Sequence, residues 1–323
     1  MKRFFKNALV LLVILVLIVF IAPFFIPVPP LENTHPPRDL ADTESQFINI
    51  NGLEVHLKTL GEGQPTFMLL HGFGANLYSW RQVMEPLSQY GKVIAFDRPG
   101  FGLTERPLEW QGQNPYSAEA QTSLVLGLMD YYGIQQAILV GNSAGGAISM
   151  QVALSNPERV KALILVDPAV YTNVVIPSWL QPVLATPQMD HLGPLLVRRI
   201  QSGGLDLLQK AWHNPDQISE ETLGDYTVAL RAENWDTALW EVTRAYQESN
   251  LNEKLGNFSL PIMIITGDDD RIIPTEDSVR LAKELPGATL TIIKDAGHVP
   301  HEEKPTAFME AVQSFLKTLN LTN

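Results

Sequence analysis

The chain has 323 residues, of which 45% are hydrophobic and 18% are charged, and its formal net charge is −12. A chain of this length can bury a substantial core in one large domain or two smaller ones. The acidic balance argues against nucleic acid as a partner, because nucleic-acid-binding proteins carry a basic face. The absence of cysteine excludes disulfides, a cysteine nucleophile, and cysteine-ligated zinc or iron–sulfur centres.

Residues 8–26 contain no polar or charged side chain. As a helix this run would extend about 28 Å, enough to cross the hydrocarbon core of a bilayer. Lys2, Arg3 and Lys6 precede the run, and no acidic residue occurs before Glu32. Because positively charged flanks stay in the cytoplasm, we expect residues 1–30 to form a cytoplasmic stub and a single-pass transmembrane anchor. The rest of the chain would then lie outside the cytoplasm.

A cleaved signal peptide, which would release a secreted protein, is the alternative for this segment. Its apolar core is usually shorter, about 7–15 residues, and small residues mark the cleavage site. Here prolines follow the apolar run instead, which favours an uncleaved anchor. The proline-rich residues 31–45 are expected to form a stiff, solvated spacer with no fold of its own.

Alternating residues on either side of Asn51-Gly52 predict a hairpin of two strands over 46–50 and 53–60. Short apolar runs predict further strands, and helical spacing predicts helices between them. The strands are expected over 66–70, 92–96, 137–140, 162–166, 262–266 and 289–293, and the helices over 118–132, 144–154, 276–285 and 306–319. Apolar strands that alternate with helices indicate an α/β fold with a mostly parallel sheet covered on both faces. Residues 46–167 and 261–323 would form this core.

Between residues 168 and 260 the alternation of strands and helices stops. Helical spacing occurs over 192–200 and 220–231, and a structureless loop of this length is uncommon in a compact domain. We therefore expect residues 168–260 to form an inserted helical cap. Its apolar stretch Val174–Leu184 could line an acyl pocket, contact lipid or pack inside the cap.

The sequence Gly141-Asn142-Ser143-Ala144-Gly145 fits the G-x-S-x-G pattern and lies between a predicted strand and a predicted helix. The glycines permit a sharp turn that lifts the Ser143 hydroxyl above the sheet. The pattern alone is weak, because a tight turn with an ordinary serine also matches it. The flanking strand and helix strengthen the prediction that Ser143 is a nucleophile.

A serine hydroxyl needs a base within hydrogen-bond reach. His298 follows the predicted strand 289–293, at the end of the strand where open α/β sheets place their ligands. His301, three residues later, is the competing candidate. The remaining histidines lie in the spacer, in the cap, within a strand or in the turn after strand 66–70. We therefore predict His298 as the base.

The base in turn needs an acid that fixes its tautomer. Asp268, Asp269 and Asp270 follow the predicted strand 262–266, and only one of them can face His298. We choose Asp270, because the sequence returns to apolar residues directly after it, and we expect the other two to be solvated. A calcium site is the alternative for this trio, but the required spacing of ligands is absent.

Acyl transfer also needs two N–H donors that stabilise the oxyanion. The amide of Ala144, directly after the serine, is one candidate. The second candidate is the amide of Phe73, in the glycine-rich turn that follows strand 66–70. Because the main chain donates, the side chain of Phe73 need not be polar. The motifs imply no metal and no organic cofactor.

Together these segments resemble the α/β-hydrolase superfamily over about residues 46–319. The matching segments are HGFG (71–74), DRPGFG (97–102), GNSAGG (141–146), GDDDRIIP (267–274) and GHVPHEEKP (297–305). The resemblance implies a mainly parallel eight-stranded sheet with a helical cap after the sixth strand. It implies the same roles for the nucleophile, acid, base and oxyanion donors, and a mostly architectural role for Asp97 and Arg98.

The serine at the turn argues against dehalogenases and epoxide hydrolases of this fold, which use aspartate there. The GNS-x-GG segment is similar to that of carbon–carbon bond hydrolases, but those often carry tryptophan after the catalytic histidine, where this chain has Val299. The HVPHEEKP segment and the anchor resemble membrane-associated monoacylglycerol lipases and related esterases.

We therefore predict a serine hydrolase that cleaves hydrophobic carboxylic esters through an acyl-enzyme intermediate. Its expected partners are a small hydrophobic ester and the membrane that holds the N-terminal helix. Hydrolysis of a carbon–carbon, amide or lactone bond by the same triad is the alternative. A non-catalytic hydrolase-fold binding protein is a third hypothesis, although such proteins typically lack a triad member.

Overall fold

The computed structural model describes residues 2–171, 178–201, 203–246 and 249–320. Eight strands form one sheet in the order β1-β2-β4-β3-β5-β6-β7-β8. They are β1 Gln46–Ile50, β2 Leu53–Leu60, β3 Thr66–Leu70, β4 Lys92–Phe96, β5 Ala137–Asn142, β6 Val160–Val166, β7 Ile262–Gly267 and β8 Thr289–Ile293. The pairs β1–β2 and β2–β4 are antiparallel and all the others are parallel. The predicted mostly parallel eight-stranded sheet is confirmed.

Helices cover both faces of the sheet, as the continuous apolar strands require. Successive side chains of a strand point to opposite faces, so Phe67 and Leu69 of β3 pack in one core cluster and Met68 and Leu70 in the other. The first cluster includes α2 (Arg81–Ser88) and α12 (Pro305–Thr318). The second includes α3 (Ala118–Tyr131), α4 (Ala144–Ser155) and α10 (Thr275–Glu284).

The chain between β6 and β7, here called the cap segment (residues 168–260), contains helices and no strand among its described residues. It contains α5 Gln181–Leu184, α6 Pro187–Gln201, α7 Gly204–Ala211, α8 Glu220–Thr227 and α9 Trp235–Ala245. Helices α6 and α9 pack closely, and a Cβ added to Gly193 would collide with the indole ring of Trp240. Residues 174–177 of the predicted apolar stretch lie outside the described residues. Trp179, in the described part, is 72% exposed.

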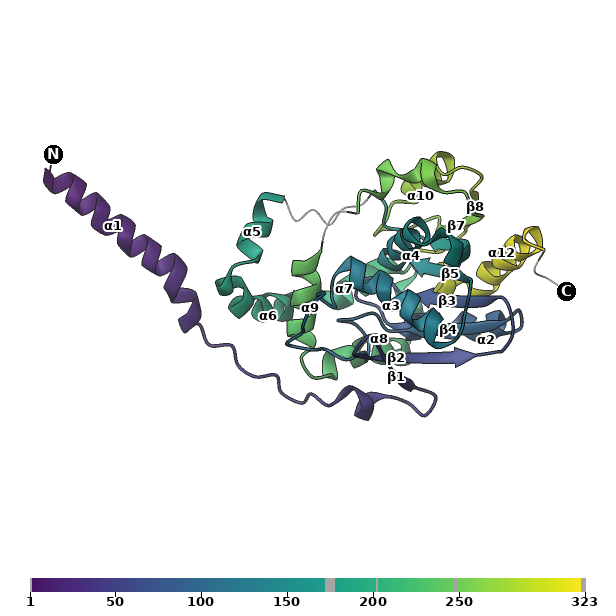
Figure 1. Cartoon of the computed structure of the whole chain (residues 1–323), viewed down its shortest axis with the longest axis horizontal. Helices are drawn as coiled ribbons and strands as arrows, with labels where there is room; N and C mark the ends of the chain where they lie inside the picture. The colour runs from purple at the N-terminus through teal and green to yellow at the C-terminus, as the bar shows by residue number, and fades with distance from the viewer. Residues whose placement is uncertain (1, 172–177, 202, 247–248, 321–323) are drawn as a thin grey trace.

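The N-terminal residues form α1 (Lys2–Ile21) and the 3₁₀ turn η1 (Ala22–Phe25). Residues Arg3–Phe25 are long and apolar enough to span a membrane, and their most apolar stretch buries no residue in the protein. A signal sequence meets the same criteria. Figure 1 shows α1 as a rod that projects away from the sheet and its covering helices.

Residues 31–45 differ from the free spacer that their proline content predicts. They contain the 3₁₀ turn η2 (Pro37–Leu40), and Arg38 binds both carboxylate oxygens of Glu54 on β2, at 3.0 and 2.6 Å. The backbone of His35 also exchanges hydrogen bonds with Arg231 and Glu233 of the cap segment, at 2.8 and 3.0 Å. Prolines remove backbone donors, but the residues between them still pair with the hairpin and the cap segment.

The approach of α4 to the sheet yields a prediction about stability. A Cβ on Gly145 would lie 2.6 Å from the carbonyl oxygen of His71 and even closer to that of Leu70. Both obstacles are backbone atoms, so we expect Gly145→Ala to lower the free energy of unfolding by about 3 kcal/mol. Gly204→Ala is the control, because no atom lies within 4 Å of its added Cβ. Urea unfolding of both variants measures the difference, and equal stabilities would contradict the prediction.

Candidate active site

The predicted nucleophile Ser143 lies at the turn between β5 and α4, with φ +52° and ψ −117°. This backbone conformation is sparsely populated for residues with a side chain, so the surroundings must hold it in place. The Ser143 N–H donates to the Val166 carbonyl at 2.9 Å, and the Ser143 carbonyl accepts from Ala147 and Ala169 at 3.2 and 3.1 Å. The side chain is thereby fixed at the tip of the turn, where the residue is 8% exposed.

The loop with the predicted oxyanion donor lies directly beside this serine. A Cβ on Gly72 would be only 3.3 Å from the Cβ of Ser143. The N–H of Phe73 makes no hydrogen bond to a described residue. The N–H of Ala144 opens α4, where helix geometry leaves it without an intrahelical acceptor. Both predicted donors are therefore unpaired beside Ser143, as an oxyanion site requires.

The predicted base and acid are in direct contact. His298 Nδ1 lies 2.7 Å from Asp270 Oδ2, while the N–H groups of Ile272 and Ile273 donate to Asp270 Oδ1 at 2.7 and 2.9 Å. An ionised carboxylate can only accept, so Nδ1 carries the hydrogen and Nε2 is left as a proton acceptor. His298 and Asp270 are both buried. This is the tautomer that a general base for a serine needs.

The other two aspartates of the loop do not reach His298. Asp268 is exposed, as predicted. Asp269 differs from the predicted solvated charge, because it binds His213 of the cap segment at 2.8 Å and also pairs with Arg271. The loop therefore points one carboxylate inward and another toward the cap segment.

Asn142 joins the serine turn to the histidine loop, and the motif alone did not identify this role. Its side-chain amide donates to the His298 carbonyl at 3.1 Å and to the Val166 carbonyl at 3.3 Å. The His298 N–H donates to the Ala211 carbonyl of the cap segment at 2.6 Å. The Ser143 hydroxyl makes no hydrogen bond to a described residue. Such bonds are often long before substrate binds.

His301, the competing base, makes no hydrogen bond to Asp270 in the described part of the chain. Its ring stacks on Trp80 with a centroid distance of 4.3 Å, and the residue is fully buried. Burial, reinforced by His298 and Arg81, lowers the pKa of His301 to about 3. A histidine held neutral in this way packs in the core and does not exchange protons with Asp270.

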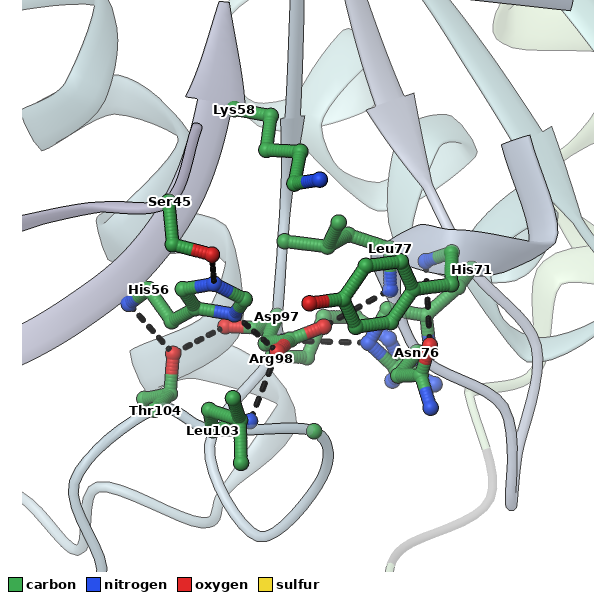
Figure 2. A network of polar contacts seen from close by, with 12 residues as sticks. Ser45, His56, Lys58, His71, Asn76, Leu77, Asp97, Arg98, Leu103 and Thr104 are labelled. Atoms are coloured by element: carbon green, nitrogen blue, oxygen red, sulfur yellow. Dashed lines mark hydrogen bonds and ion pairs between the residues drawn. The ribbon is translucent and has the colours of Figure 1, made fainter. Parts of the chain in front are cut away.

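A second Ser–His–Asp arrangement occurs at the opening hairpin (Figure 2). Ser45 Oγ lies 2.8 Å from His56 Nε2, and His56 Nδ1 lies 2.6 Å from Asp97 Oδ2. The Ser45 hydroxyl, however, donates to Asp42 at 2.9 Å, so it accepts from His56 and cannot give its proton to that ring. The direction of these hydrogen bonds is the reverse of what a nucleophilic serine requires.

Asp97 also organises the loop that carries the predicted oxyanion donor. Its carboxylate accepts from the N–H groups of Leu77 and Leu103, each at 2.7 Å, as Figure 2 shows. The next residue, Arg98, donates from its side chain to the Gly72 carbonyl at 2.9 Å and from its N–H to His71 Nε2 at 3.0 Å. These contacts give Asp97 and Arg98 the architectural role that the resemblance implies.

Comparison with known proteins gives the class of the molecule. Residues 65–305 match the family model described as the alpha/beta hydrolase fold. The chain is 28% identical to the 2-hydroxy-6-oxononadienedioate/2-hydroxy-6-oxononatrienedioate hydrolase of Comamonas testosteroni, over 85% of this chain and 96% of that protein. This chain therefore belongs to the alpha/beta hydrolase fold family, and it is a hydrolase.

Two solved structures are similar to the fold. The enol-lactonase from Burkholderia xenovorans LB400 has a TM-score of 0.66 and 25% identity, over 84% of this chain and 100% of that chain. A bacterial membrane phospholipase A has a TM-score of 0.68 and 24% identity, over 99% of both chains. The second match therefore includes the N-terminal helix.

The two Ser–His–Asp arrangements can be distinguished by one labelling experiment. We expect Ser143→Ala to abolish labelling by a fluorophosphonate probe and to lower kcat/KM by about 10⁴-fold or more. Ser45→Ala removes the same hydroxyl from the other arrangement and should leave labelling intact. In-gel fluorescence of the full chain measures both variants. A folded Ser143→Ala protein that is still labelled would show that the nucleophile lies elsewhere.

Proposed function

We propose that the protein is a serine hydrolase that cleaves hydrophobic carboxylic esters. The observation that carries the proposal is the buried pair of His298 and Asp270, 2.7 Å apart, which Asn142 links to a serine held in a strained turn. A non-catalytic binding protein of this fold would have no need of that strain or of the unpaired amides at Phe73 and Ala144. The buried pair and the turn are what acyl transfer requires.

In the proposed mechanism Ser143 attacks the ester carbonyl while His298 Nε2 takes its proton. Asp270 stabilises the imidazolium that forms and holds its orientation. The N–H groups of Phe73 and Ala144 bind the oxyanion of the tetrahedral intermediate. His298 then protonates the leaving alcohol, and water attacks the acyl-enzyme by the same steps. The nucleophile, base, acid and oxyanion donors of this mechanism are all residues of this chain.

Contacts between the cap segment and the N-terminal residues support an ester that comes from a membrane. His191 and Arg198 of α6 bind the carbonyls of Ile26 and Pro29, at 2.8 and 2.7 Å. The neighbouring α5 exposes apolar side chains, including Val183. In Figure 1, α5 and α6 occupy the side of the molecule from which α1 extends. An anchored domain would hold this apolar part of the cap segment at the lipid surface.

The membrane phospholipase A supports the same proposal, because its similarity covers the N-terminal helix as well as the domain. We propose that residues 1–30 are a single-pass anchor with a cytoplasmic N-terminus and an extracytoplasmic domain. The cap segment, residues 168–260, would then select among hydrophobic esters such as neutral lipids.

Hydrolysis of a carbon–carbon or lactone bond is the second candidate. It is supported by the relative in Comamonas testosteroni and by the enol-lactonase. The same base, acid and oxyanion donors would serve these reactions, so substrate trials must separate them from ester hydrolysis.

A series of p-nitrophenyl esters of increasing acyl length tests the substrate class. We expect kcat/KM to rise with chain length to a medium- or long-chain optimum, because each buried methylene contributes about 0.8 kcal/mol, or about fourfold. The full chain in detergent is measured beside Ser143→Ala as the blank. If a folded, probe-labelled enzyme turns over no ester, the carbon–carbon alternative replaces this proposal.

Cell fractionation tests the anchor. The full chain should remain in the membrane after carbonate extraction, and deletion of residues 2–26 should move it to the soluble fraction, because the only apolar span described is lost. Protease added outside intact cells should digest the domain. Recovery of a soluble mature protein whose first residue lies beyond residue 26 would instead establish a cleaved signal peptide.

A further inference from the structure

Asp167 is a fully buried acid that the mechanism above does not use. It directly follows β6, at the same sheet edge as Asp270, and its φ is +44°. Its Oδ1 accepts from the hydroxyl of Thr266 at 2.6 Å and from the N–H of Gly267 at 3.3 Å. Both donors belong to the end of β7, just before the loop that carries Asp270. One oxygen of Asp167 is therefore satisfied as an acceptor.

The other oxygen, Oδ2, has no hydrogen-bond partner among the described residues although it is fully buried. One ligand atom each of Asp167, Asp270 and His298 lies within 4.8 Å of the others. A buried carboxylate oxygen without a donor is costly, whereas a protonated oxygen needs only an acceptor. The acceptor next to Asp167 is the Asp270 carboxylate.

Asp270 is the member of the pair whose contacts are those of an acceptor. Its oxygens accept from His298 and from two backbone amides, the donors that suit a carboxylate. Burial of two neighbouring carboxylates makes the doubly charged pair costly. Burial and the charge of Asp270 raise the pKa of Asp167 well above its usual value.

The other titratable groups around Asp167 are consistent with a neutral Asp167 beside a charged neighbour. Asp270 and His298 face Asp167 from the loops after β7 and β8. Its neighbours on β7, Thr266 and Gly267, carry no charge. His301 lies near enough to His298 for their charges to interact, and burial lowers its pKa to about 3.

We propose that Asp167 holds a proton on Oδ2 and donates it as a hydrogen bond toward Asp270, acting as a positioning residue for the acid and base. The proposal rests on the proposed function of Asp270 and His298. The donor disperses part of the Asp270 charge and fixes the plane of its carboxylate. It also prevents Asp270 from taking the proton of His298 Nδ1. The three groups then hold one negative charge when His298 is neutral.

Asp167→Asn and Asp167→Ala separate the hydrogen bond from the charge. Asparagine mimics the protonated acid and tolerates positive φ. We expect Asp167→Asn to keep kcat/KM within about threefold, with the acid-limb pKa of its pH profile unchanged to about 0.2. Alanine removes the donor, so kcat should fall about tenfold and the acid-limb pKa should rise by about 0.5, because the undispersed charge stabilises the imidazolium. Asp167→Gly, which relieves the strain at positive φ, replaces alanine if that variant unfolds.

Infrared spectroscopy tests the proton without any substrate. The carbonyl band of a protonated carboxyl group should persist in the wild-type full chain at pH 9 and be lost in Asp167→Asn. Glu302, whose pKa burial raises to about 7, is ionised at that pH. Because this readout needs no ester hydrolysis, it distinguishes failure of this proposal from failure of the proposed function.

Two results would overturn the proposal. One is an unchanged infrared band in Asp167→Asn together with an acid limb lowered by about one unit or more. This result would mean that Asp167 is ionised in the wild type and that the substitution removed its negative charge. The other is an equal kcat for folded Asp167→Asn and Asp167→Ala, which would mean that the hydrogen bond has no role.

Discussion

The strained turn at Ser143 is the constraint on which the rest of the site depends. A left-handed backbone at a serine is held only if the chain on both sides is fixed, and here β5 precedes it and α4 follows at once. The close approach of α4 to β3, which Gly145 permits, brings the helix N-terminus under the loop of Phe73. The same packing thus lifts the hydroxyl and places both amides beside it. Substrate binding then needs little rearrangement of the backbone.

A second set of contacts, centred on Asp97, holds the other side of the site. Asp97 is completely buried and accepts from His56 and from two backbone amides. Burial would raise its pKa, but His56, His71 and the backbone donors lower it overall, so the carboxylate stays charged. Removal of one partner from such a group leaves a buried charge uncompensated and typically costs about 3–5 kcal/mol. The neighbouring Arg98 donates to the Gly72 carbonyl, so the oxyanion loop is held to the same buried network.

Alternating residues predicted the hairpin strands β1 and β2. Apolar runs predicted the other six strands, of which β3, β5 and β7 are buried at every residue. They placed the end of β5 at residue 140, whereas the strand continues to Asn142. Glycine and asparagine carry no apolar signal, although their backbone pairs with β6. In the cap segment, one helix predicted over 220–231 is instead α8 followed by the 3₁₀ turn η7 (Val228–Arg231).

The proposed triad could be predicted because each member follows a strand whose end is visible in the sequence. The contacts that hold it could not. Ala211 acts through its carbonyl, for which sequence gives no signal, and Asn142 occupies a position that the motif leaves open. The sequence did give a signal for Asp167, because it directly follows the predicted strand 162–166 and so lies at the sheet edge that carries Asp270 and His298. Only its unpaired oxygen distinguishes it from an ordinary turn residue.

The cap segment is fixed to the core at one end, and this bears on where substrate enters. His213 donates its N–H to Glu303 at 2.8 Å, and Ala211 accepts from the histidine loop. Arg81 joins α8 to α11 (Pro300–Glu303), because it binds Thr222 and Glu302, each at 2.7 Å. Displacement of this end would move His298 itself. Helices α5 and α6 lack these bonds to the histidine loop in the described part of the chain, and α6 binds carbonyls of the N-terminal residues. The α5–α6 end is therefore the part of the cap segment that can move to admit the proposed ester while the bonds that hold His298 stay in place.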